Sequence, residues 1–145
     1  MTIWFDMDGT IANLYGVENW LPMLLSENAF PYTIAKPMLN MSILARYLNK
    51  VQSKGIQIGI ISWGSKNSSQ EYLQAVQEAK KEWLKIHLKS VTWDSIKIVE
   101  HGTPKNNYCV DVNDILFDDE LNNRNTWSGQ SFEPTYILEV LKTYC

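Results

Sequence analysis

The chain has 145 residues, of which 45% are hydrophobic and 20% are charged, and its formal net charge at pH 7 is −3. This length fits one domain with a core of its own, and the composition is that of an ordinary soluble globular protein. The acidic balance argues against a large nucleic-acid surface, which is usually basic. The two cysteines, Cys109 and Cys145, indicate no disulfide framework.

The first residues, MTIWFDMDGT, contain neither a basic leader nor a long apolar stretch. No window of the sequence approaches the roughly 18 uninterrupted apolar residues that indicate a membrane-spanning helix. Internal repeats and low-complexity tracts are also missing. We therefore expect a cytoplasmic protein that forms a single domain over residues 1–145 and has no membrane partner.

Short runs of strand-forming residues alternate with longer amphipathic patterns along the chain. In chain order we expect a strand at 2–5, an irregular stretch at 13–37 with a helix broken near Pro22, a helix at 38–54, a strand at 55–62, a helix at 68–88, strands at 96–99 and 114–119, and a closing helix at 133–144. The hydrophobic residues of the expected strands are largely continuous rather than alternating, which is typical of a parallel sheet covered on both faces. Strands and helices that alternate in this way predict an α/β fold.

Acidic, hydroxyl and lysine side chains gather where the expected strands end. They are Asp6 and Asp8 after the first strand, Ser62 at the end of the second, Lys105 in the loop before the fourth, and Asp118 and Asp119 at the end of the fourth. Ligands of open α/β sheets bind beyond the carboxyl ends of the strands, so we expect these side chains to share one crevice. Asp6 and Asp8 are two residues apart, and they point the same way if the strand extends to them.

This combination of side chains has a chemical interpretation. Several carboxylates in one crevice repel one another unless a cation lies between them, and Mg²⁺ is typically held by one or two carboxylates together with water and substrate phosphate. Ser62 and Lys105 would then contact the remaining phosphoryl oxygens. An aspartate can attack phosphorus, and a second acid can transfer protons. Each feature taken alone is more often a turn, a strand end or a helix cap, but together they predict phosphoryl transfer.

With these residues in this order, the sequence resembles the haloacid dehalogenase (HAD) superfamily of phosphatases from Ile3 to Glu120. The DxDx[TV] motif of that family corresponds to residues 6–10, DMDGT. The apolar strand of the second motif, which ends in a hydroxyl residue, corresponds to IGIIS and Ser62. The lysine of the third motif corresponds to Lys105, and the acidic fourth motif corresponds to LFDDE, residues 116–120.

The resemblance implies a Rossmann-like three-layer sandwich with a mainly parallel sheet and a small helical cap insert at about 14–37. It implies the following roles: Asp6 as the nucleophile that forms an aspartyl-phosphate, Asp8 as the general acid/base, Ser62 and Lys105 as ligands of the phosphoryl group, and Thr10 as support for the phosphate-site loop. It also implies Mg²⁺ held by the Asp6 carboxylate, the Asp8 backbone carbonyl and an acid of the fourth motif, with Asp119 favoured over Asp118. Many members have a further acid four or five residues later, where this chain has Asn123 and Arg124.

The stretch DMDGTIANLYGVENW (6–20) also resembles the 5′(3′)-deoxyribonucleotidase branch, in which aromatic side chains near the first motif contact the nucleoside. Tyr15, Trp20 and Trp63 are candidates for such contacts, so a nucleoside monophosphate is the leading substrate hypothesis. One alternative is a polynucleotide 3′-phosphatase, against which the net charge argues. Another is a non-catalytic HAD-like module that binds a phosphate ligand or a partner. The oligomeric state is left open, a homo-oligomer included.

Two further interpretations concern residues outside these motifs. The run EAKKEWLK (78–85) places opposite charges side by side, which predicts a solvent-exposed helix face. His101 lies four residues before Lys105 and is close enough to approach the site, although a loop residue without a role is the favoured interpretation.

Overall fold

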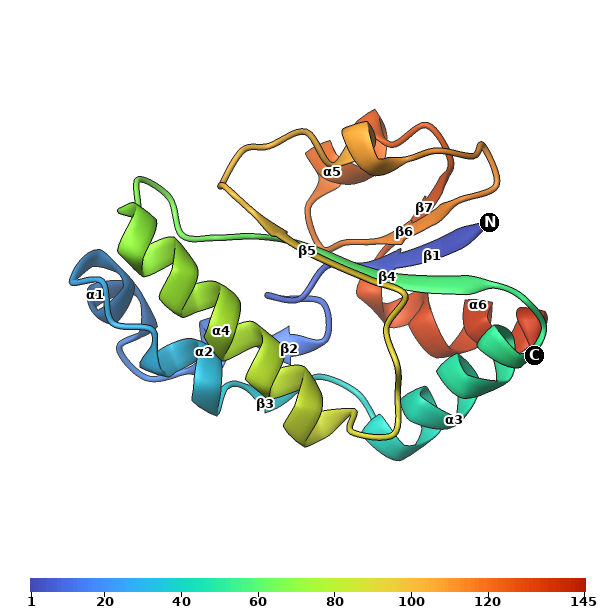
Figure 1. The fold of residues 1–145 in the computed structure, drawn as a ribbon, viewed down its shortest axis with the longest axis horizontal. Coiled ribbons are helices and arrows are strands. Elements are labelled where there is room, and N and C mark those ends of the chain that lie inside the picture. Colours follow the sequence, from blue (N-terminus) through green and yellow to red (C-terminus); the bar gives the residue numbers. More distant parts are fainter.

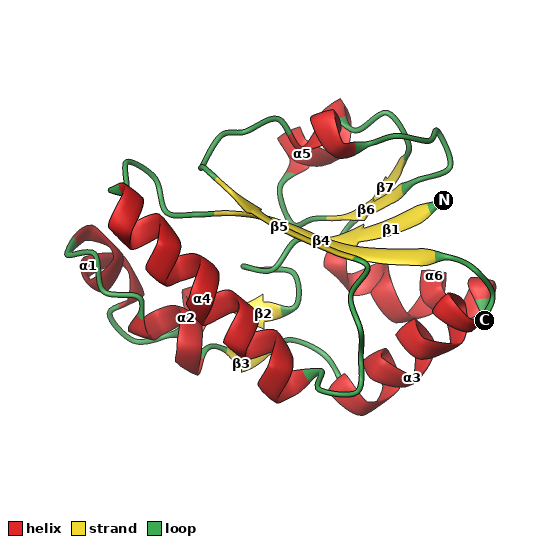
Figure 2. Cartoon of the chain, in the orientation of Figure 1, coloured by secondary structure: helices red, strands yellow, loops and turns green.

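Five parallel strands form a sheet through the centre of the molecule (Figures 1 and 2). The computed structural model describes residues 1–145. The strands are β1 (Thr2–Phe5), β4 (Gln57–Trp63), β5 (Ser95–Val99), β6 (Ile115–Phe117) and β7 (Gln130–Phe132). Their order across the sheet is β5-β4-β1-β6-β7, so the direction in which strands are added reverses at β1. The predicted α/β fold with a parallel sheet is confirmed, and the arrangement is Rossmann-like.

Helices cover both faces of this sheet. Figure 1 shows α3, α4 and α6 on one face and α5 on the other. Their bounds are Met41–Ser53 for α3, Gln70–His87 for α4, Leu121–Thr126 for α5 and Ile137–Tyr144 for α6. The chain also forms three short 3₁₀ helices, which are η1 (Leu14–Gly16), η2 (Lys105–Tyr108) and η3 (Pro134–Tyr136). The three long helices lie where they were predicted, although the last begins as η3. These helices lack the combination of length and apolar character that crossing a membrane requires.

The strands bury side chains on both faces, as their continuous apolar sequences predict. Ile58 and Ile60 of β4 belong to the large core under α3, α4 and α6, whereas Ile61 belongs to a smaller cluster on the opposite face. In β1, Phe5 faces the large core and Trp4 faces the smaller cluster. This double burial fixes β1 and β4 at the centre of the fold and holds the residues that follow them in place.

The segment between β1 and α3 forms an excursion from the central sheet, and its two ends lie side by side. A two-stranded antiparallel ladder joins its ends, with β2 (Ala12–Asn13) paired to β3 (Lys36–Pro37). Between them lie α1 (Trp20–Leu25) and α2 (Phe30–Ile34), and α2 packs against α4. The predicted break near Pro22 is wrong. Pro22 lies in the first turn of α1, where its missing N–H has no helical acceptor to lose.

Candidate active site

The carboxyl ends of β1 and β6 meet at the point where the strand order reverses. Asp6 follows β1, and its backbone N–H donates to the carbonyl oxygen of Phe117 at 2.9 Å. Asp118 and Asp119 directly follow β6. Ligands of open α/β sheets bind in the crevice beyond such a switch point. The topology therefore brings the acids of the two motifs together, as the sequence predicted.

A tight loop turns the chain away immediately after Asp6. The Met7 carbonyl accepts hydrogen bonds from the backbone N–H groups of Thr10, Ile11 and Ala12 at 3.0 Å each. Because β1 ends at Phe5, Asp6 and Asp8 are not successive outward residues of one strand, and the expected alternation does not apply. Their side chains have different partners, but both line the same cavity.

Lys105 lies buried between two of the carboxylates, at the start of η2. Its Nζ is 2.9 Å from Asp6 Oδ1 and 2.6 Å from Asp118 Oδ2, and the residue is only 3% exposed. Burial lowers the pKa of Lys105, but the attraction of Asp6 and Asp118 outweighs it and brings the pKa to about 12. The ammonium group is therefore charged at neutral pH and neutralises part of the acidic cluster.

Asp118 and Asp119 have different environments although they are neighbours. Asp118 is fully buried and accepts hydrogen bonds from Lys105, from Asn123 Nδ2 at 3.1 Å and from the Glu120 backbone N–H at 2.9 Å. The Asp119 carboxylate has one long contact, from Thr10 Oγ1 at 3.4 Å. Burial and the charge of Asp6 raise the pKa of Asp118 to about 6 and that of Asp119 to about 8.

These acids form a candidate cation site. Asp6, Asp118 and Asp119 each place one carboxylate oxygen within 4.8 Å of the others. Lys105 supplies one positive charge for three carboxylates, and burial together with the neighbouring charge of Asp6 raises the pKa of Asp119. Asp119 also has the most open coordination positions, because Asp118 already accepts three hydrogen bonds and Asp6 two.

Thr10 and Ser62 are both buried, and neither lines the cavity. Thr10 Oγ1 donates to Asp6 Oδ2 at 3.0 Å and so orients that carboxylate. Ser62 Oγ accepts a hydrogen bond from Lys80 Nζ at 2.7 Å. Lys80 also binds Asp8 and is 1% exposed, so the prediction of a solvent-exposed face for residues 78–85 is wrong at this position.

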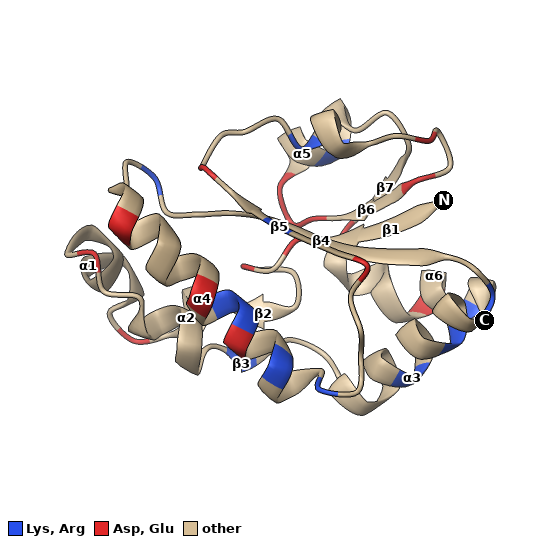
Figure 3. Ribbon diagram, viewed as in Figure 1, with Lys and Arg blue, Asp and Glu red and all other residues tan.

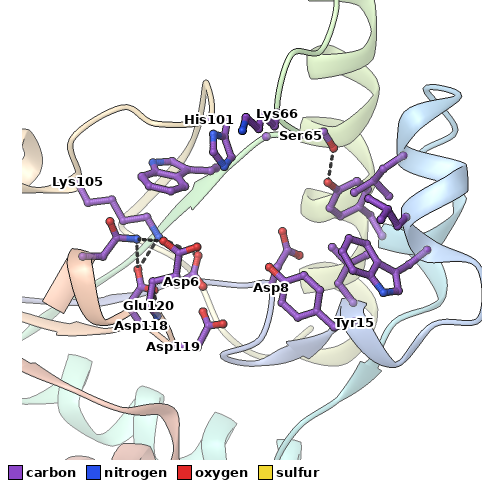
Figure 4. Close-up of a pocket in the computed structure, with 18 of the residues that line it drawn as sticks. Asp6, Asp8, Tyr15, Ser65, Lys66, His101, Lys105, Asp118, Asp119 and Glu120 are labelled. Carbon is purple, nitrogen blue, oxygen red and sulfur yellow. Dashed lines mark hydrogen bonds and ion pairs between the residues drawn. The ribbon is translucent and has the colours of Figure 1, made fainter.

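The cavity has a volume of about 220 Å³ and two contrasting walls. Figure 4 shows Asp6, Lys105, Asp118 and Asp119 on one side and Tyr15 on the other, with Asp8 between them. The second wall comes from the segment between β2 and β3 and is largely apolar. Its residues are Leu14, Tyr15, Trp20, Leu21, Leu24, Leu25 and Tyr32.

Aromatic rings in the cavity wall are held in fixed arrangements. Tyr15 and Trp20 meet edge to face, with ring centroids 4.9 Å apart. Trp63 donates from Nε1 to the Thr103 carbonyl at 2.8 Å, and the His101 ring lies 4.8 Å from the Trp63 ring. The three aromatic candidates from the sequence thus all line the cavity. His101 also lines the cavity, and its ring lies beside that of Trp63, so it does approach the site.

Gly9 allows the loop after Asp6 to pass close to Asp119. Its φ is +79°, and a Cβ at this position would collide with the Asp119 carboxylate and approach the Tyr15 ring. We expect Gly9→Ala to lower the free energy of unfolding by about 1–3 kcal/mol, the usual cost of such backbone strain, and to impair function. Gly55→Ala is the matched control, because Gly55 has a φ of +86° with open space around it. Chemical denaturation measures both variants, and an equal effect of the two on function would contradict a specific role of Gly9.

The fold and the site together define a Rossmann-like α/β protein with an acidic cluster at the switch point of its sheet. When the chain is compared with protein-family models and with curated proteins, no significant match is found.

Proposed function

We propose that this protein is a Mg²⁺-dependent phosphomonoesterase of the HAD type, with a nucleoside monophosphate as its best candidate substrate. The observation that carries the proposal is the meeting of Asp6, Lys105 and the Asp118–Asp119 pair at the switch point, with Asp8 in the same cavity. These residues come from three separate parts of the chain. A non-catalytic phosphate-binding module would have no chemical need for a second, separately held aspartate at position 8.

The donor set fits a hard divalent cation. Carboxylate oxygens are the ligands that Mg²⁺ takes in proteins, usually one or two together with water and phosphate oxygens. Asp6 and Asp119 would supply these carboxylates and the Asp8 backbone carbonyl a third ligand, while Asp118 would hold Lys105. When bound, Mg²⁺ would offset the charge of the transferring phosphoryl group.

The residues of the chain then divide the reaction into two displacements. An Asp6 carboxylate oxygen attacks phosphorus and forms the aspartyl-phosphate, while the ester P–O bond breaks and the leaving oxygen takes a proton from Asp8. Asp8 next removes a proton from water, whose oxygen attacks phosphorus. The bond between phosphorus and Asp6 breaks, which releases inorganic phosphate and restores the Asp6 carboxylate. Lys105 fixes Asp6 and offers its charge to the phosphoryl oxygens.

The apolar wall supports a substrate with a flat, weakly polar leaving group. Aromatic side chains can stack on a nucleobase. Tyr15 stands across the cavity from the acids, and Trp20, in edge-to-face contact with Tyr15, also lines the cavity. In this proposal the segment between β2 and β3 acts as the small cap of the enzyme. Figure 3 shows Lys and Arg spread over several helices and interleaved with acids on α4, so a polynucleotide would find no continuous basic track.

The deciding experiment is a hydrolysis panel with the purified chain. It compares nucleoside 5′- and 3′-monophosphates, sugar phosphates and 3′-phosphorylated oligonucleotides, each with Mg²⁺ and with EDTA, by release of inorganic phosphate. We expect Mg²⁺-dependent release, fastest from nucleoside monophosphates. Release from none of the esters, with metal binding demonstrated separately, would leave the binding module as the better explanation. Preference for the oligonucleotide would favour the 3′-phosphatase.

The raised pKa of Asp119 predicts how stability depends on pH and metal. Its pKa is about 8 in the fold against an ordinary value of 3.8, so between these values the folded protein holds a proton that the unfolded chain has released. The contribution of this group to the free energy of unfolding is therefore greatest below pH 3.8 and is lost as the pH rises towards 8. A divalent cation replaces the proton, so we expect Mg²⁺ to raise the melting temperature more near pH 8 than near pH 5.

Thermal melts at these two pH values, with Mg²⁺ or with EDTA, measure this effect. Asp119→Asn removes both the charge and the titrating group, and it should reduce the difference between the Mg²⁺ shifts at the two pH values, with Asp118 (pKa about 6) left as the remaining source of pH dependence. An equal Mg²⁺ shift in the wild type and in Asp119→Asn would place the cation elsewhere.

A further inference from the structure

Lys80 is a buried cation at the site that the proposed reaction does not use. It lies in the middle of α4, on the face of that helix that packs against the fold, and is 1% exposed. Its neighbour Lys81 is exposed and has no ion-pair partner. A lysine is rarely buried to this extent unless its ammonium group is fully paired.

The ammonium group of Lys80 uses all three of its N–H donors within the protein. It donates to Asp8 Oδ2 at 2.8 Å, to Ser62 Oγ at 2.7 Å and to the Trp63 carbonyl oxygen at 2.7 Å. It also lies 5.0 Å from the centre of the Tyr32 ring. Lys80 therefore ties together the loop after β1, the end of β4 and helix α4, and none of its donors is left for a substrate.

The contact with Asp8 fixes one carboxylate oxygen and leaves the other free. Asp8 Oδ2 is held by Lys80, and the Asp8 side chain makes no other hydrogen bond. Asp8 nevertheless lines the cavity, between the acidic cluster and Tyr15 (Figure 4). The carboxylate that must reach the leaving oxygen is thus anchored through its second oxygen.

The contact with Ser62 has a similar consequence. Lys80 can only donate, so the Ser62 oxygen acts as the acceptor, and the Ser62 hydroxyl proton is given to no acceptor within the protein. Ser62 is fully buried and does not line the cavity, so this contact fixes the end of β4 beneath the cavity. One buried ammonium group thereby sets the geometry of both side chains.

We propose that Lys80 is a positioning residue, which holds the Asp8 carboxylate in place for proton transfer to the leaving oxygen. The inference rests on the proposed phosphatase function and adds a residue that acts only through Asp8. A misplacement of about 1 Å at a catalytic group can cost on the order of 10²-fold in rate. Loss of Lys80 should therefore slow the steps that need a proton from Asp8 and spare those that do not.

Leaving-group chemistry separates this role from a merely structural one. The test compares single-turnover rates of phosphoenzyme formation from the best nucleoside monophosphate and from 2,4-dinitrophenyl phosphate, whose leaving group departs without a proton. In Lys80→Met we expect a loss on the order of 10²-fold with the nucleotide and a loss of no more than about threefold with the dinitrophenyl ester. Lys81→Met, one residue along the same helix, should match the wild type with both.

A double variant keeps the test decisive if Lys80→Met alone does not fold. Lys80→Met leaves the Asp8 charge unpaired, whereas Lys80→Met with Asp8→Asn removes both members of the pair. If Lys80 acts through Asp8, the double variant and Asp8→Asn should have equal rates. A further tenfold loss in the double variant, or an equal loss with both esters in Lys80→Met, would overturn the positioning role while the phosphatase stands. Failure of the wild type to hydrolyse any phosphomonoester would overturn both proposals.

Discussion

Replacing Asp6 with asparagine is expected to abolish turnover, with a loss on the order of 10⁴-fold or more, as for other deleted nucleophiles. An amide cannot replace the carboxylate oxygen that attacks phosphorus. The substitution changes the shape of the side chain little, and Lys105 Nζ, 2.9 Å from Oδ1 in the wild type, can still donate to an amide oxygen. Phosphate release in the presence of Mg²⁺ measures the loss. Mass spectrometry after acid quenching should detect one added phosphoryl group on the wild type and none on Asp6→Asn.

Asp114→Asn is the matched control for the removal of a buried carboxylate. Asp114 is 2% exposed, but it accepts hydrogen bonds from the backbone N–H groups of Thr2 and Val110 and does not line the cavity. This variant should lose stability and keep the turnover of whatever fraction is folded. Retention of activity by Asp6→Asn would mean that a different residue attacks phosphorus, and the roles assigned to Lys105 and Thr10 would then have to change as well.

The sequence was sufficient to predict four of the five strands of the sheet and the gathering of the acids, because both follow from strong local patterns. The strands β1, β4 and β6 are largely continuous apolar runs, and the switch-point rule brings Asp6 and Asp118 together once those runs are known to be parallel. The strand β7 and the helix α5 were not predicted. Their sequences, QSF and LNNRNT, are short and polar, and β7 is stabilised by its pairing with β6.

Lys80 shows why the rest of the site was missed. Tyr72, Val76, Ala79 and Trp83 form the buried stripe of α4, and Lys80 occupies a position on that stripe. This register was the available signal, but the neighbouring charges of residues 78–85 favoured a solvated face. The partner that makes burial of Lys80 acceptable, Asp8, lies 72 residues away, so no local pattern connects the two. Ser62 was located correctly at a strand end, but the direction of its hydroxyl group depends on this same lysine.

Replacing Asp8 with asparagine should slow hydrolysis of an alkyl phosphomonoester by about 10²–10⁴-fold, the range in which a general acid or base contributes. Asparagine neither gives a proton to the leaving oxygen nor accepts one from water. With 2,4-dinitrophenyl phosphate the first step needs no proton, so Asp6 can still attack. Hydrolysis of the aspartyl-phosphate is then slow, because no base activates the attacking water molecule. We therefore expect a burst of about one phenolate per chain and then very slow turnover. Stopped-flow absorbance measures both phases.

The two aspartate variants should thus fail in opposite ways. Asp6→Asn never forms the phosphoenzyme, whereas Asp8→Asn forms it and accumulates it when the leaving group is good. If the two aspartates served only to bind a cation, both variants would lose phosphoenzyme formation and turnover alike. Wild-type rates with both esters would remove Asp8 from proton transfer. An equal loss with both esters and no burst would mean that Asp8 shapes the cavity for the attack by Asp6. Only a burst that appears in Asp8→Asn and is absent in Asp6→Asn assigns attack on phosphorus to Asp6 and movement of protons to Asp8.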